Sequence, residues 1–274
     1  MTKSTRSLDG FVKGSFTSTR GVCHDNYRFG SGPAVVIIHE VPGVTPLVAA
    51  FARRVAGHDM TAVLVSLLGT PGRPVSAGYA VASMIRACVS REFTMLATKN
   101  TSPVVDYLCE LAAHEHQTCG GPGVGAVGMC LTGGFALAMS VEPSVVAPVM
   151  SQPSLPLPLT KDRRRELGLS NADLAIVKQR TASDLCVMGL RFTGDTKAPA
   201  ERFARLREEL GANFIGVEID SSIPNPWGYR KAAHSVLTED YSHAPGSPTR
   251  QALDDVLDFL SSRLGVSPAP PRTT

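Results

Sequence analysis

The sequence predicts an α/β fold with a mostly parallel central sheet and helices on both faces of that sheet. Three observations predict it. Strand-like and helix-like segments alternate along the chain, the strands are continuous apolar runs, and turns rich in glycine and proline separate the elements. With 274 residues, 43% of them hydrophobic, the chain can bury a large core. We therefore expect a single α/β domain.

The expected domain covers residues 21–265. Residues 1–20 are polar and rich in serine and threonine, and we expect a flexible N-terminal segment there. Residues 266–274 are rich in proline and are expected to be disordered. Residues 152–180 begin with a proline-rich stretch, and we expect them to form a surface helical excursion that lies over the functional site.

The elements are expected to follow one another as strand, helix, strand. The predicted strands are apolar runs rich in β-branched residues, at 34–40, 61–68, the run before Cys130, 145–150, 185–192 and 213–219. The predicted helices have apolar residues at helical spacing and cover 46–57, 79–97, 102–116, 199–210 and 248–264. A long loop is expected over 221–241. Strands joined by helices imply right-handed crossovers and a parallel sheet.

The composition excludes several classes of partner. The chain has 27 Lys and Arg against 24 Asp and Glu, a net charge of +3, and no long basic run, which argues against a nucleic-acid partner. No apolar run reaches the roughly 18 residues of a membrane span. The N-terminus lacks the apolar middle of a signal peptide, so we expect a cytoplasmic protein. The six cysteines have no paired spacing, as is typical of reduced thiols. A small-molecule partner is expected.

The strongest chemical signal is the stretch GAVGMCLTGG at residues 125–134. A short apolar strand leads into Cys130, and a helix then opens with two glycines. In α/β-hydrolases such a strand–turn–helix corner carries the nucleophile. A helix N-terminus also favours the thiolate form of a cysteine. The expected oxyanion donors are the backbone N–H of Leu131 and, from the loop after the first parallel strand, that of Val41.

A cysteine nucleophile needs a base and an acid that orients this base. In α/β-hydrolases they follow the nucleophile in the order acid, then histidine. Only His234 and His243 follow Cys130, and we favour His234 because it lies nearer the last strand. Asp195, directly after the strand before the last one, is the favoured acid, and Asp220 is its competitor.

Four short motifs occur in order over about residues 25–265. They are HEVPGVTP at 39–46, GMCLTGG at 128–134, GD at 194–195 followed by Pro199, and HS at 234–235. With these motifs the chain resembles the dienelactone hydrolase family. The resemblance implies an α/β-hydrolase fold and a triad of Cys130, His234 and Asp195. It also implies that Glu40 is a fourth participant, which controls the protonation of the cysteine as substrate binds.

The sequence departs from the family pattern at three positions. The family elbow commonly reads Cys-Leu-Gly-Gly, whereas Thr132 is the second residue after the cysteine here. The family binds a substrate carboxylate with two arginines, and Thr70 and Thr238 stand at the corresponding positions. Arg73 lies close to the first and is expected to bind substrate. An ester, lactone or thioester without this carboxylate is therefore as good a candidate substrate as dienelactone.

The expected activity is hydrolysis of an ester, lactone or thioester through an acyl-enzyme on Cys130, with water activated by His234. No cofactor and no metal is implied. Trp227, the only tryptophan, is expected either to line the pocket beside His234 or to anchor a proline-rich loop. The alternative is a non-catalytic protein that senses thiol chemistry or binds a small molecule on a hydrolase scaffold. The oligomeric state is left open.

Overall fold

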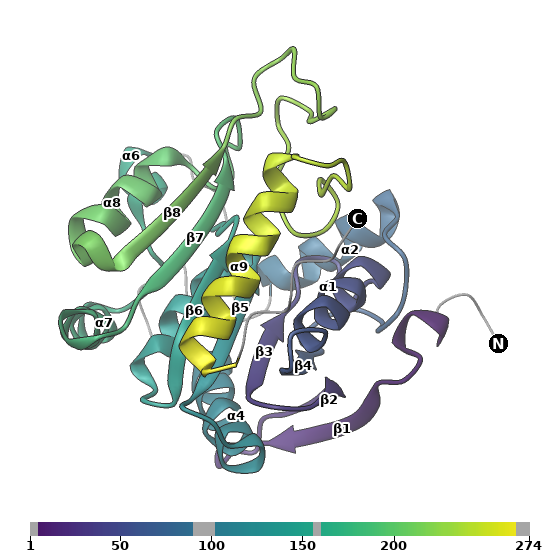
Figure 1. Cartoon of the computed structure of the whole chain (residues 1–274), viewed down its shortest axis with the longest axis vertical. Coiled ribbons are helices and arrows are strands. Elements are labelled where there is room, and N and C mark those ends of the chain that lie inside the picture. Colours follow the sequence, from purple (N-terminus) through teal and green to yellow (C-terminus); the bar gives the residue numbers. More distant parts are fainter. Residues whose placement is uncertain (1–4, 90–101, 156–159, 267–274) are drawn as a thin grey trace.

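The structure, a computed structural model, describes residues 5–89, 102–155 and 160–266. One eight-stranded sheet runs through it in the order β1-β2-β4-β3-β5-β6-β7-β8 (Figure 1). The neighbouring pairs from β4 to β8 are parallel, whereas β2 pairs antiparallel with both β1 and β4. The predicted α/β fold with a mostly parallel sheet is confirmed.

The six parallel strands are the apolar runs that the sequence indicated. They are β3 (Ala34–Ile38), β4 (Thr61–Val65), β5 (Val124–Met129), β6 (Val145–Ser151), β7 (Val187–Phe192) and β8 (Phe214–Ile219). Every residue of β3, β4, β5 and β7 is buried. Successive side chains point to opposite faces, so Val36 packs into the core on one face and Val35 into the core on the other. A sheet covered on both faces explains why these strands show no polar alternation.

The prediction of a flexible segment over residues 1–20 is wrong for much of its length. Residues Thr5–Leu8 form a 3-10 turn, and β1 (Val12–Thr17) pairs with β2 (Cys23–Gly30), a strand that was also not predicted. The pairing runs in register from Val12 opposite Arg28 to Thr17 opposite Cys23. β1 is an edge strand with mostly exposed side chains, so backbone hydrogen bonds hold it and no apolar pattern marks it.

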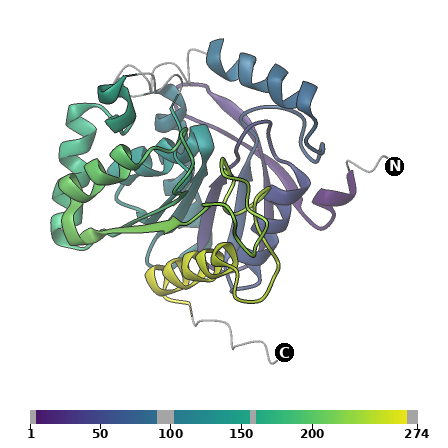
Figure 2. The same ribbon diagram turned by 90° about the horizontal axis from the view of Figure 1, so that it is seen from above.

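Helices cover both faces of the sheet. They are α1 (Pro46–Ala56), α2 (Ala77–Val89), α4 (Pro103–Cys119), α5 (Gly133–Ala138), α6 (Lys161–Arg165), α7 (Asn171–Ser183), α8 (Ala200–Leu210) and α9 (Pro248–Leu264). The apolar faces of α1 and α9 pack on one side of the sheet, and those of α4, α5, α7 and α8 on the other (Figures 1 and 2). None of the helices in the described ranges is long and apolar enough to cross a membrane.

The segment 152–180 contains the predicted surface helices, but α7 does not lie over the carboxyl ends of the strands. Val177 of α7 is fully buried in the core on one face of the sheet. The Arg180 guanidinium donates to the carbonyl oxygen of Val145, the first residue of β6, at 2.9 Å. The C-terminal part of α7 therefore lies near the amino end of that strand. Residues 156–159 and the predicted disordered residues 267–274 lie outside the described residues.

Candidate active site

Cys130 occupies a sharp turn between β5 and α5. Its φ is +58°, a left-handed conformation that costs a residue with a side chain about 1–3 kcal/mol. The chain crosses itself closely here, because a Cβ on Gly128 would lie 2.1 Å from the carbonyl oxygen of Thr132. The Cys130 carbonyl accepts a hydrogen bond from the Ser154 N–H at 2.9 Å. These contacts hold the backbone in the conformation of a nucleophile elbow.

The threonine that departs from the family elbow has a definite structural role. Thr132 is buried, and its hydroxyl oxygen lies 2.9 Å from the carbonyl oxygen of Ile38, the last residue of β3. The same oxygen accepts a hydrogen bond from the Met129 N–H at 2.9 Å. Thr132 thus links the turn after β5 to the end of β3, where a glycine could provide no side-chain link.

Asp195 and His234 form a buried hydrogen-bonded pair. The distance between His234 Nδ1 and Asp195 Oδ2 is 2.6 Å. The Asp195 side chain is 3% exposed and that of His234 is 11% exposed. A Cβ on Gly194 would lie 2.1 Å from the carbonyl oxygen of Lys231, so the glycine lets the histidine loop approach the end of β7. This close approach is the physical reason for the Gly-Asp pair in the sequence.

Cys130 lies beside the His234 ring and helps to raise the pKa of this histidine. Burial by itself lowers the pKa of His234, but the neighbouring Cys130 and Asp195 together raise it to about 10. The second ring nitrogen, Nε2, is buried and has no well-aligned hydrogen bond within the described part of the chain. The arrangement therefore favours an imidazolium at His234, facing Cys130, at neutral pH.

The structure leaves the two competing residues away from this pair. His243 is exposed and its ring lies edge-on against Tyr241, with 4.8 Å between ring centroids. Asp220 is also exposed, and its carboxylate accepts a hydrogen bond from the Ser222 N–H at 2.8 Å. Of the candidates for base and acid, His234 and Asp195 are the two that the fold brings together.

The other cysteines differ from Cys130 in their surroundings. Burial raises the pKa of the Cys109 thiol to about 12, and burial also raises the pKa of Cys119. Both thiols are therefore poor nucleophiles at neutral pH. Five cysteines are seen as free thiols in the described part of the chain: Cys23, Cys109, Cys119, Cys130 and Cys186.

Glu40 leaves the sheet at the same edge as Cys130. In the parallel pair of β3 and β5, Ile38 lies opposite Gly128, and Glu40 and Cys130 each follow two residues later. The Glu40 side chain is buried, and one of its oxygens accepts a hydrogen bond from the Ser235 hydroxyl at 2.7 Å. The other oxygen accepts a hydrogen bond from the Thr238 hydroxyl. Thr238 therefore binds Glu40 from the position at which the family resemblance implies an arginine.

The loop that contains Val41 is held by a neutral histidine. His39 is fully buried, and burial lowers its pKa to about 4. Its Nε2 accepts hydrogen bonds from the N–H groups of Leu67 and Leu68 at 3.1 and 3.2 Å, so Nδ1 carries the proton and donates to the Glu40 carbonyl at 2.8 Å. Val41 and Leu131, the two predicted oxyanion donors, directly follow Glu40 and Cys130 at the ends of adjacent strands.

The two predicted substrate-binding residues lie in different settings. Arg73 is exposed on the loop after β4, and its guanidinium lies 4.2 Å from the centroid of the Tyr79 ring. The Tyr79 hydroxyl accepts a hydrogen bond from the Thr70 N–H at 2.6 Å, so this loop is ordered around the aromatic ring. Trp227 is partly buried and packs against the apolar core to which α1 and α9 contribute, which favours anchoring of its loop over lining of a pocket.

Two polar residues of the site were missed in the sequence. Gln152 is fully buried and follows β6 directly, and its side-chain amide donates to Glu40 at 3.1 Å. The Asp240 carboxylate accepts hydrogen bonds from the N–H groups of His234 and Ser235 at 2.8 and 3.1 Å. The one signal that could have found Gln152 is its place directly after a buried parallel strand, at the edge where ligands bind in such sheets.

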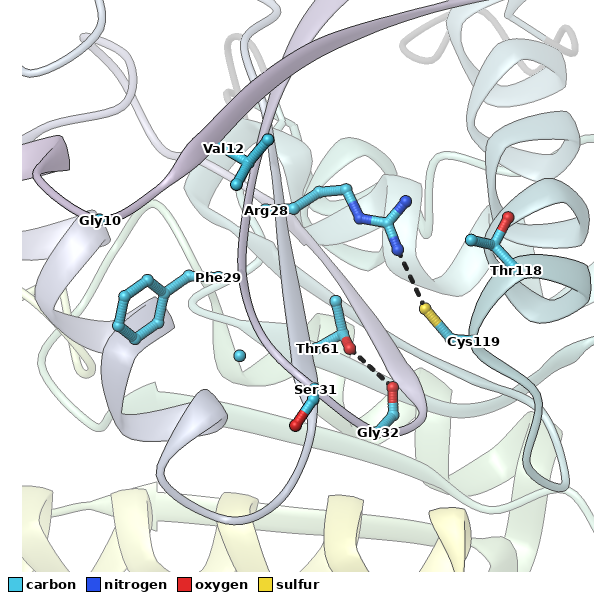
Figure 3. Close-up of a pocket in the computed structure, with 10 residues that line it drawn as sticks. Gly10, Val12, Arg28, Phe29, Ser31, Gly32, Thr61, Thr118 and Cys119 are labelled. Atoms are coloured by element: carbon cyan, nitrogen blue, oxygen red, sulfur yellow. Dashed lines mark hydrogen bonds between the residues drawn. The ribbon is translucent and has the colours of Figure 1, made fainter.

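A cavity of about 690 Å³ lies at the other end of the sheet (Figure 3). Its lining includes Thr61, the first residue of β4, and Gly30, the last residue of the antiparallel β2. Arg28 crosses it and donates to the Cys119 sulfur at 3.2 Å. None of the predicted site residues lines this cavity, so it is separate from the chemistry at Cys130.

Comparison with known proteins agrees with this geometry. Residues 24–264 match the profile of the dienelactone hydrolase family. The chain belongs to the dienelactone hydrolase family. Membership identifies it as a hydrolase of the kind that cleaves esters and lactones. A comparison with curated protein sequences gave no match.

Solved structures show that this family member has an α/β-hydrolase fold. An α/β-hydrolase from Penicillium sp. sh18 aligns with a TM-score of 0.59 at 13% identity, over 93% of this chain and 99% of its own. A dienelactone hydrolase-like promiscuous phosphotriesterase from metagenomic libraries gives 0.57 at 15% identity, over 93% and 100%. An esterase from Pyrococcus furiosus gives 0.56 at 13% identity, over 95% of each chain.

Proposed function

We propose that this protein is a cysteine-dependent hydrolase that cleaves an ester, lactone or thioester through an acyl-enzyme. The observation that carries the proposal is the buried pair of His234 and Asp195, 2.6 Å apart, beside the thiol of Cys130 on its strained turn. Membership in the dienelactone hydrolase family supports it. We place the reaction in the cytoplasm, where reduced cysteines persist.

The proposed reaction has two halves. The Cys130 thiolate attacks the carbonyl carbon, and the N–H groups of Leu131 and Val41 bind the resulting oxyanion. The tetrahedral intermediate collapses, and His234 transfers its Nε2 proton to the departing alkoxide or thiolate. His234 then takes a proton from water, which attacks the acyl-enzyme and releases the carboxylic acid and the thiolate. Asp195 keeps Nδ1 protonated and the ring oriented throughout.

Glu40 is the proposed fourth participant. Its buried carboxylate leaves the sheet at the same edge as Cys130 and is hydrogen-bonded to the loop that carries His234. A negative charge there opposes a second negative charge on the neighbouring cysteine. A change in its contacts on substrate binding would therefore alter the balance between thiol and thiolate, as the family resemblance implies.

The charges around Glu40 favour a substrate without a carboxylate. Glu40 is bound by the hydroxyls of Ser235 and Thr238 and by an amide, all of them neutral groups. Burial raises the pKa of Glu239, and the negative charges of Glu40 and Asp240 raise it further. A substrate carboxylate placed here would meet the same repulsion. Arg73, proposed to contact substrate, is exposed on a separate loop.

A panel of aryl esters, lactones and thioesters, each paired with an analogue that carries a free carboxylate, tests this proposal. We expect hydrolysis of the uncharged members, with kcat/KM at least about tenfold higher than for the carboxylate analogues, which corresponds to about 1.4 kcal/mol. Initial rates at several substrate concentrations measure the difference. A preference for the carboxylate members would contradict the substrate class, and no hydrolysis of any member would contradict the activity.

Alkylation by iodoacetamide distinguishes the hydrolase from a thiol sensor and tests the charge state of the site. Because the pKa of His234 is raised to about 10, the imidazolium beside Cys130 persists from pH 6 to pH 8, and we expect the alkylation rate of Cys130 to vary little over this range. In His234→Ala the site should behave as an ordinary thiol, which ionises near pH 8.5, and the rate should rise about 100-fold over this range. Mass spectrometry of the Cys130 peptide measures the rate.

His243→Ala is the matched control, since that histidine is exposed and away from Asp195, and its alkylation profile should equal that of the wild type. In a hydrolase the His234→Ala variant should also lose ester turnover. A reactive Cys130 together with no turnover of any ester, lactone or thioester would favour the sensor.

A further inference from the structure

We propose that Gln152 is a positioning residue that holds the loop of His234 in the position where the His234 ring faces Cys130. Its side-chain amide connects this loop to Glu40 and to the end of β6. The inference rests on the proposed function, because it concerns the residue that would serve as the catalytic base. It adds a residue that neither the sequence motifs nor the family resemblance indicated.

Gln152 contacts most of the segments that build the site. Its backbone N–H donates to the Leu190 carbonyl of β7 at 2.7 Å, and its carbonyl accepts from the Ser154 hydroxyl at 3.2 Å. Ser154 in turn donates its N–H to the Cys130 carbonyl. The backbone of Gln152 is therefore tied to the strand that leads to the catalytic acid and, through one residue, to the nucleophile.

The side chain of Gln152 reaches the other two segments. Its Nε2 donates to Glu40 Oε2 at 3.1 Å, and its Oε1 accepts from the Val236 N–H at 3.4 Å. The Ser151 hydroxyl also donates to this Oε1. The amide thus acts as donor to one segment and acceptor from another at the same time. The side chain is fully buried, so water does not compete for these hydrogen bonds.

The backbone conformation of Gln152 is unusual for a residue with a long side chain. Its φ is +38°, and Cys130 and Asp59 are the other non-glycine residues with positive φ in the described ranges. A left-handed conformation costs energy, and it persists where surrounding contacts hold it, often at functional sites. Here the conformation directs a buried amide toward Glu40 and Val236.

The contacts of Gln152 and Glu40 converge on the residues that follow His234. Ser235 and Thr238 donate their hydroxyls to Glu40, and Val236 donates its N–H to Gln152. Removal of the amide would release Val236 and leave Glu40 with one donor fewer. Asp240 would still hold the N–H groups of His234 and Ser235, so the loop should shift without unfolding. A shift of about 1 Å at reacting groups can lower a rate by about 100-fold.

Gln152→Asn and Gln152→Glu test the inference. Asparagine tolerates the left-handed backbone better than glutamine, but its amide is one methylene shorter and cannot bridge the same two groups. Glutamate keeps the length but places a second carboxylate against Glu40. With an ester that the wild type hydrolyses, we expect Gln152→Asn to lower kcat about 100-fold with KM within about threefold. Gln152→Glu should lower kcat at least as much.

Cys130 alkylation provides a readout that a purely structural defect would not move. When His234 no longer faces the thiol, the alkylation rate should rise with pH, as in His234→Ala, although circular dichroism shows a folded protein. Ser140→Ala is the matched control, because Ser140 is fully buried, makes a hydrogen bond to the Ala136 carbonyl at 3.4 Å and lies in the turn after α5. It should keep the wild-type kcat and alkylation profile.

Wild-type kcat in Gln152→Asn would overturn the inference. A lower kcat with the wild-type alkylation profile would overturn it as well, since His234 would then still face Cys130. If the wild-type protein hydrolyses no ester, lactone or thioester, the proposed function fails by itself. The pH profile of alkylation in the Gln152 variants would still report where His234 lies.

Discussion

Replacement of Cys130 by alanine is expected to lower kcat/KM for a wild-type aryl ester substrate by at least about 1,000-fold. The variant retains Leu131, Val41 and the histidine pair, so substrate can still bind, but no group is left to form the acyl-enzyme. Alanine pays a similar cost for the φ of +58° as cysteine does, and the fold should be unchanged by circular dichroism. Steady-state rates measure the effect.

Cys186→Ala is the matched control for this variant. Cys186 is a free, partly buried thiol whose contact is with the side chain of Asn213, and its removal should change kcat/KM by less than about twofold. Mass spectrometry after reaction with an activated ester should find the acyl group on Cys130 in the wild type. Wild-type turnover in Cys130→Ala would show that the nucleophile is a different residue.

Replacement of Asp195 by asparagine should lower kcat/KM by about 100- to 10,000-fold. The carboxylate accepts the Nδ1 proton of His234 at 2.6 Å and helps to raise the pKa of His234 to about 10. An amide lacks this charge and can present an N–H to the ring, which would favour the wrong tautomer. The pKa of His234 should fall toward its ordinary value. The imidazolium of the variant should then lose its proton at a lower pH than that of the wild type, and the remaining activity should decline with rising pH over that lower range.

Asp220→Asn controls for the loss of an aspartate at the end of a neighbouring strand. Asp220 is exposed and caps the Ser222 N–H, so kcat/KM should stay within about twofold of the wild type. Rates measured from pH 6 to pH 10 compare the two variants. Equal losses in both, or a loss confined to Asp220→Asn, would contradict the assignment of Asp195 as the acid.

The parallel strands and the long helices could be predicted because their side chains carry the pattern. α9 was expected over 248–264 and is found at Pro248–Leu264, with its apolar stripe on the sheet. β1 could not be predicted, because pairing of its backbone with β2 holds it and its side chains are mostly exposed. Backbone hydrogen bonds form with almost any residue type, so they produce no recognisable pattern in the sequence.

The candidate chemistry was visible in the sequence to the extent that it depends on strand ends. Cys130 and Asp195 each follow a buried parallel strand, and the carboxyl ends of such strands meet at one edge. His234 and His243 could not be separated by geometry from the sequence, because both lie in irregular segments. The structure separates them, because Gly194 lies against the Lys231 carbonyl and this close approach brings the His234 loop to Asp195.

The sequence by itself determined the fold class, the family and the candidate nucleophile, because apolar runs, glycine turns and short motifs are local properties of the chain. Tertiary structure alone decided what Glu40 contacts. It placed Thr238 against this carboxylate from 198 positions away, and Gln152 from 112. A buried carboxylate must find donors wherever the fold supplies them, and which donors those are depends on how distant segments cross.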